Sequence, residues 1–84
     1  MMEAPVIVTK QGQKSNWGIY SFVQLPSPND KINLISNRKR QHVVVSHVLH
    51  EATHVEDPID PDRFPAWIHA DWIGEIDPET GNVR

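Results

Sequence analysis

Apolar and polar residues alternate along much of this chain, and that two-residue period is typical of β-strands. The alternation and the abundance of β-branched and aromatic residues predict four strands, over residues 5–10, 17–25, 31–35 and 66–76. In the last of these, Ile68, Ala70 and Trp72 fall on one face of the strand. One face of each strand is therefore expected to be buried.

Prolines and polar turn residues separate the predicted strands. The SNRKRQ stretch (36–41) reads as a hairpin connection, and Pro28-Asn29-Asp30 reads as a turn, because proline presets φ while Asn and Asp bond their own backbone. Three prolines in 56–65 interrupt the chain before the last strand, since proline removes a backbone donor. We expect a proline-rich loop there.

The segment 42–55, HVVVSHVLHEATHV, is compatible with a helix or a strand, because apolar residues also recur at helical spacing. Its many valines are stiff at χ1 and favour a strand. The flanking charges also oppose a helix: 38–40 are all basic where the helix would begin, and Glu56 and Asp57 follow its end. We expect a long strand that bends between two parts of a barrel and pairs with 31–35.

Five residues of this segment, HEATH (50–54), match the H-E-x-x-H motif of zinc metallopeptidases. By that resemblance His50 and His54 would bind zinc, Glu51 would be the general base, and Asp60 has the spacing of a third ligand. On a helix, side chains four residues apart lie about 6 Å apart. On a strand they lie roughly 13 Å apart, too far for one zinc ion. We therefore interpret the match as coincidental and expect no cofactor, with a zinc-dependent hydrolase as the alternative.

Five short strands with turn residues between them predict one all-β domain over 1–84, a small, partly open barrel, with a flexible tail from about residue 77. We expect six apolar side chains to line its core: Ile32, Leu34, Val45, Leu49, Ile68 and Trp72. A chain of this length hides only about 60–65% of its unfolded surface, so the core is small.

A wider pattern, over about residues 20–76, resembles small uncharacterised bacterial proteins with an SH3-like β-barrel. Its first part is Pro26 through Leu34, followed by a hairpin and a long strand through Val45, Val48 and His50. A final strand then carries the Trp72-Ile73 pair. The resemblance implies an SH3-like barrel and supplies no catalytic residues.

Composition limits the classes of function. The chain has no cysteine, so disulfides, thiolate zinc sites and cysteine nucleophiles are excluded, and a reducing, cytoplasmic setting is expected. No signal peptide is evident, and no apolar run is long enough to span a membrane. The formal net charge of −3 argues against a general attraction to nucleic acid.

A small non-catalytic binding module is the function that this sequence favours. Trp17 and Trp67 are its candidate recognition aromatics, because aromatic residues are enriched at interface hot spots. Edge strands can also pair with a protein or peptide partner or with a second copy. As a further alternative, the basic hairpin tip (Arg38, Lys39 and Arg40) and the aromatic stretch of Trp17, Tyr20 and Phe22 would together bind single-stranded nucleic acid.

Overall fold

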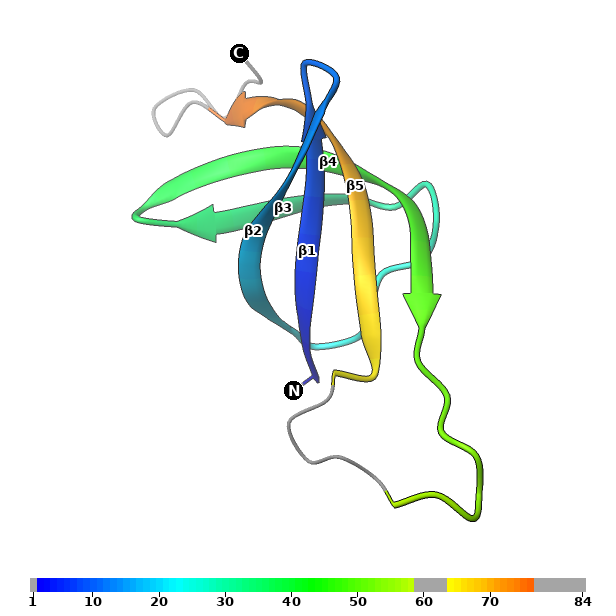
Figure 1. Ribbon diagram of the computed structural model, residues 1–84. Coiled ribbons are helices and arrows are strands. Elements are labelled where there is room, and N and C mark those ends of the chain that lie inside the picture. Colours follow the sequence, from blue (N-terminus) through cyan, green and yellow to red (C-terminus); the bar gives the residue numbers. More distant parts are fainter. Residues whose placement is uncertain (1, 59–63, 77–84) are drawn as a thin grey trace.

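The structure, a computed structural model, describes residues 2–58 and 64–76 and is all-β over these ranges (Figure 1). It contains five strands and no helix there: β1 (Met2–Lys10), β2 (Gln13–Phe22), β3 (Lys31–Ser36), β4 (Lys39–His50) and β5 (Ala66–Ile76). The predicted fold class is confirmed. The predicted flexible tail from residue 77 and most of the proline-rich loop lie outside the described residues.

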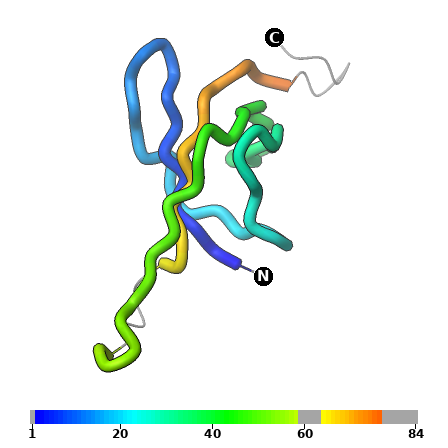
Figure 2. The backbone as a smooth tube through the Cα atoms, turned by 90° about the vertical axis from the view of Figure 1, so that its right-hand side faces the viewer, coloured from blue at the N-terminus to red at the C-terminus, as the bar shows by residue number. Residues whose placement is uncertain are grey.

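All five strands form one sheet in the order β2-β1-β5-β4-β3. The pairing of β1 with β5 is parallel, and the other three pairings are antiparallel. β3 and the first half of β4 run across the direction of β1, β2 and β5, so the sheet curls into a half-barrel (Figure 1). Figure 2 shows β3 standing apart from the β1–β2 hairpin, so the barrel is partly open, as predicted.

β4 is the long strand that turns the sheet. Its first part pairs with β3 while its whole length runs beside β5. The β4–β5 register shifts twice, between His42 and Val43 and between Val45 and His47. Such bulges bend a strand and increase its twist, which lets β4 serve both halves of the barrel.

The core lies on the concave face and is built from small and β-branched side chains. Among the described residues, eight buried side chains form one cluster: Ala4, Val6, Val8, Leu34, Val43, Val45, Ile68 and Ala70. Two further residues of the predicted core, Ile32 and Trp72, are partly buried and pack against this cluster. Leu49 was predicted wrongly: it is 54% exposed, because the bulge near Ser46 reverses the alternation and turns Val48 inward instead.

Trp72 connects three strands where the two halves of the sheet meet. Its indole Nε1 donates a hydrogen bond of 2.8 Å to Gln41 Oε1 on β4. The Lys10 ammonium, at the end of β1, lies 4.3 Å from the centre of its ring. A cation at this distance is attracted by the ring face, so this half-buried tryptophan joins β1, β4 and β5.

Both hairpins close with two residues of positive φ. Gln11 and Gly12 have φ of 52° and 78°, and Asn37 and Arg38 have φ of 52° and 64°. Positive φ at both central positions is the geometry of a type I′ turn, whose twist matches the flanking strands. The SNRKRQ connection is therefore a tight turn at Asn37-Arg38, with Lys39 and Arg40 already in β4.

Three predicted strands have bounds that are wrong by three or more residues. The first strand was predicted over 5–10 but begins at Met2. The second strand was predicted over 17–25 but spans Gln13–Phe22, because the polar 13–16 segment completes the hairpin with β1 beyond a bulge opposite Val6 and Ile7. The long strand was predicted over 42–55 but begins at Lys39 and ends at His50. A strand ends where its hydrogen bonding to the neighbouring strand ends, and the alternation of side chains in the sequence does not show this point.

The turn at Arg38 gives a test of this geometry. A non-glycine residue at positive φ is strained, whereas glycine adopts it freely. We expect Arg38→Gly to raise the free energy of unfolding by about 0.5–1 kcal/mol. Arg38→Ala removes the same charge but keeps the strain, so denaturant unfolding should show little change for it; equal effects of the two variants would contradict the assigned turn.

Candidate functional site

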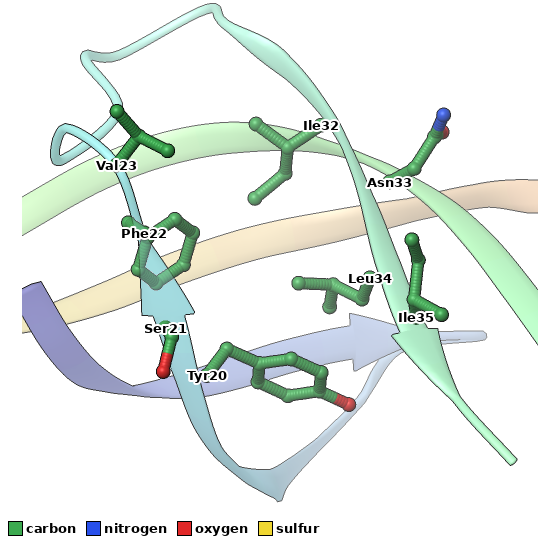
Figure 3. A pocket seen from close by; sticks show the side chains of 8 residues that line it. All are labelled: Tyr20, Ser21, Phe22, Val23, Ile32, Asn33, Leu34 and Ile35. Atoms are coloured by element: carbon green, nitrogen blue, oxygen red, sulfur yellow. The ribbon is translucent and has the colours of Figure 1, made fainter. Parts of the chain in front are cut away.

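The open side of the barrel contains a cavity between β2 and β3, the two edge strands of the sheet (Figure 3). Its volume is about 430 Å³, within the range of ligand-binding clefts. Four residues of each wall line it: Tyr20, Ser21, Phe22 and Val23, and opposite them Ile32, Asn33, Leu34 and Ile35. We call this cavity the β2–β3 groove.

Apolar side chains dominate the groove. Tyr20 and Phe22 from β2 and Ile32 and Leu34 from β3 lie in the space between the strands (Figure 3). All four pack against or belong to the core, so the floor of the groove is continuous with it. The groove therefore lies where the core extends to an opening that no strand of the described residues covers.

Two apolar side chains at the groove remain in contact with water. Val23, directly after β2, is 91% exposed, and Ile35 on β3 is 60% exposed. Single exposed apolar residues are common on proteins. Here, however, both line the same apolar cavity, and such a combination is typical of an interaction surface.

The strands that form the walls each have one unpaired edge. Within the described residues, β2 pairs with β1 alone and β3 pairs with β4 alone. Two backbone hydrogen bonds join Val45 of β4 to the connection before β3. The Val45 N–H donates to Asp30 O at 2.8 Å, and the Val45 C=O accepts from Asn29 N–H at 2.7 Å. Alternation along the ladder then directs the backbone groups of Asn33 and Ile35 away from β4, towards the groove.

A second cavity, of about 390 Å³, continues the groove along the connection between the two strands. It shares Phe22 and Ile32 with the groove and adds residues of the 24–27 segment together with Asp30 and Lys31. The Asp30 carboxylate accepts a hydrogen bond from Ser27 N–H at 2.8 Å. This bond and the backbone hydrogen bonds of Asn29 and Asp30 to Val45 hold the connection in place against β4.

The basic hairpin tip lies at the opposite end of the groove from Lys31. Arg38, Lys39 and Arg40 are all exposed. In the β3–β4 ladder Arg40 pairs with Ile35, a groove residue, and Lys39 pairs with Ser36 beside it. The structure thus brings the predicted basic tip next to a groove that the sequence did not predict.

The HEATH motif does not form the helix that its metal-binding geometry requires. His50 is the last residue of β4, opposite Ala66 of β5, and 51–54 continue as irregular chain. Glu51 N–H bonds Pro65 O at 2.9 Å, and the His54 ring accepts a hydrogen bond from Glu56 N–H at 3.2 Å. The described residues hold no group of three or more His, Asp or Glu able to bind a metal ion, and Asp60 lies outside them.

The two candidate recognition tryptophans lie apart from the groove lining. Trp17 is half-buried against the core, and its Nε1 donates to Ser15 Oγ at 3.0 Å. Trp67 lies on the convex face of β5, beside Leu49 of β4. Neither tryptophan lines the groove.

Sequence reasoning missed the groove because it assigned Ile32 and Leu34 only to the core. One signal was present in the sequence: Leu34 and Ile35 are adjacent on a strand, so they must face opposite sides, and only one can enter the core. The exposure of Val23 had no such signal and became visible only in the structure.

Two histidines stack on the convex face. The rings of His47 and His69 have centroids 4.3 Å apart and planes inclined by 13°. Ser46 Oγ donates to His69 O at 3.0 Å and lies 3.2 Å from His47 Nδ1. Burial, the neighbouring His47 and the Lys14 ammonium all lower the pKa of His69 below its ordinary 6.5.

The chain has no significant match to a protein-family model, to a curated protein or to a solved structure. The resemblance to bacterial SH3-like proteins therefore stays a prediction. In the ranges that the structure describes, no helix is suited to crossing a membrane.

The stacked histidines predict how stability depends on pH. Because the folded chain binds a proton at His69 less readily than the unfolded chain, the free energy of unfolding should fall as the pH drops through 6.5 towards the lowered pKa. Between about pH 8 and pH 5, urea denaturation should show a smaller loss of unfolding free energy for His69→Gln than for the unaltered chain. His54→Gln, in the loop after β4, is the control and should keep the pH dependence of the unaltered chain. If both variants changed the pH dependence equally, the stacked pair would not be its cause.

Proposed function

We propose that this chain is a small non-catalytic binding module, which takes an extended segment of a protein partner into the β2–β3 groove. One observation carries the proposal: an apolar cavity lies between two strands that, in the part of the chain that the structure describes, each pair on one side only. Such an arrangement suits strand addition, in which backbone hydrogen bonds give affinity and side-chain pockets give specificity.

The dimensions of the groove suit an extended chain. Four consecutive residues form each wall, which corresponds to roughly 13 Å of strand. A segment of that length places alternate side chains on the two sides of its backbone. Those facing the module would meet Tyr20, Phe22 and Leu34, while the backbone would lie beside Asn33 and Ile35.

The exposed apolar residues supply part of the driving force. Covering Val23 and Ile35 with a partner would remove apolar surface from water, a gain of roughly 1–2 kcal/mol each before the entropy cost of association. The floor of the groove needs no rearrangement, because Phe22 and Ile32 already pack against the core. A preformed site keeps the cost of binding low.

Binding of single-stranded nucleic acid through base stacking has less support. Stacking needs ring faces that are open to a base, as in single-strand-binding barrels. Tyr20 and Phe22 pack against the core, and the remaining groove residues are mainly aliphatic. The zinc-hydrolase alternative would need a helix at HEATH, whereas His50 ends β4 and 51–54 are irregular chain.

A peptide selection tests the proposal. We expect a phage-displayed library of about seven random residues to yield binders with alternating apolar residues. Replacing Val23 and Ile35 together by Gln should weaken a selected synthetic peptide about tenfold or more, because both apolar contacts are lost. Calorimetry measures the affinity, and a thermal melt confirms that the variant is folded.

Two exposed apolar residues outside the groove provide the matched control. Val55 is 92% exposed in the loop after β4, and Leu49 is 54% exposed on the convex face, so they match Val23 and Ile35 in exposure. The double Gln variant at Val55 and Leu49 should keep its affinity. Equal loss in the two double variants, or a library that yields no binder, would overturn the proposal.

A further inference from the structure

The charge of the chain is divided unevenly along the sequence. Residues 13–50, which contain both walls of the groove and the basic tip, hold five basic residues and a single acid, Asp30. The segment after residue 50 holds nine acids and two basic residues. Its seven excess negative charges outweigh the four excess positive charges of residues 13–50, which gives the net charge of −3. Four of these five basic residues, Lys31 and the basic tip, belong to β3 and to the hairpin that follows it, so the overall charge conceals a local positive charge beside the groove.

The basic side chains stand at both ends of the groove. Lys31 lines the continuing cavity at one end. At the other end the hairpin tip places Arg40 opposite Ile35 and Lys39 opposite Ser36. All of these cations are exposed. A segment lying along the groove would therefore pass between two positively charged ends.

The one acid of this region is engaged within the chain. Asp30 accepts the hydrogen bond from Ser27 N–H, and its own backbone bonds Val45. Its carboxylate belongs to the turn that precedes β3. It offsets only part of the positive charge that Lys31 and the hairpin tip present.

We propose that the occupant of the β2–β3 groove is an acidic extended segment of another protein, in which apolar residues alternate with Asp or Glu. This inference rests on the proposed function and adds the charge of the partner. The apolar residues would face the groove floor. The carboxylates, on the outer side of the bound strand, would be attracted by Lys31, Lys39 and Arg40.

The same charges disfavour a second copy of this chain as the occupant through its own edge strands. Pairing β3 with β3 of another copy would bring Lys31 and the basic tips of both chains together. Like charges across a strand pair are destabilising, and charged edges oppose self-association. An acidic partner turns that repulsion into attraction.

Three synthetic peptides of about seven residues test the inference, with identical Val and Ile at alternate positions and Glu, Gln or Lys between them. At low salt we expect the Glu peptide to bind at least about tenfold more tightly than the Lys peptide, with the Gln peptide between them. Added salt should weaken the Glu peptide and leave the Gln peptide nearly unchanged.

Charge reversal on the protein provides the second arm. Replacing Lys31 and Lys39 by Glu should remove the preference for the Glu peptide over the Lys peptide, measured as the ratio of the two affinities. Lys14→Glu is the control: Lys14 is an exposed lysine of β2, but it pairs with Thr9 and acts electrostatically on His69 of the convex face. Thermal melts check the fold of each variant.

The outcomes separate the inference from the proposed function. Equal affinity for all three peptides overturns the acidic partner and leaves the groove as a peptide site. Binding of none of them overturns both. If an oligothymidylate binds, loses affinity when Lys31 and Lys39 are replaced and keeps it in Ile35→Gln, the partner is a nucleic acid. A dimer in sedimentation analysis, broken by Ile35→Gln, makes a second copy the occupant.

Discussion

The position of β5 between β1 and β4 is the constraint on which the rest of the structure depends. It pairs with β1 in parallel and with β4 in the antiparallel sense, and so connects the two hairpins. Ile68 and Ala70, which it contributes to the core, lie between the valines of β1 and β4. Because parallel neighbours cannot be joined by a tight turn, the chain passes through β2, β3 and β4 before it returns as β5 beside β1.

Once β5 occupies the centre, β2 and β3 are left as edges. The curl of the sheet brings these edges to the same side of the core, where a closed barrel would pair them. The connection at 23–30 joins them at one end but is fixed to Val45, on the side away from β2. The groove, with its apolar floor and the unpaired backbone of β2 and β3, thus has one origin. Over the described residues the barrel does not close, and the core extends to its opening.

The strands and much of the core could be predicted because they depend on local alternation. Leu34, Val45 and Ile68 followed from a two-residue period, and the pairing of β3 with β4 followed from the polar SNRKRQ connection between them. The exact turn at Asn37 and Arg38 did not. Leu49 did not, because a bulge adds one residue and reverses the face of everything after it. The parallel β1–β5 pairing, and hence the identity of the edges, depends on contacts between the chain ends, for which no local signal exists.

Net charge illustrates the same dependence on arrangement. A value of −3 predicts repulsion of an acidic partner if the charge is spread evenly over the molecule. Between exposed charges, however, screening limits the interaction to about a Debye length, near 8–10 Å. At that range the relevant charges are those of Lys31 and the basic tip, which stand at the groove ends, and the acids after residue 50 contribute according to their own distance. The electrostatic preference of a small binding module therefore follows from the few charges beside its groove, and the fold decides which ones those are.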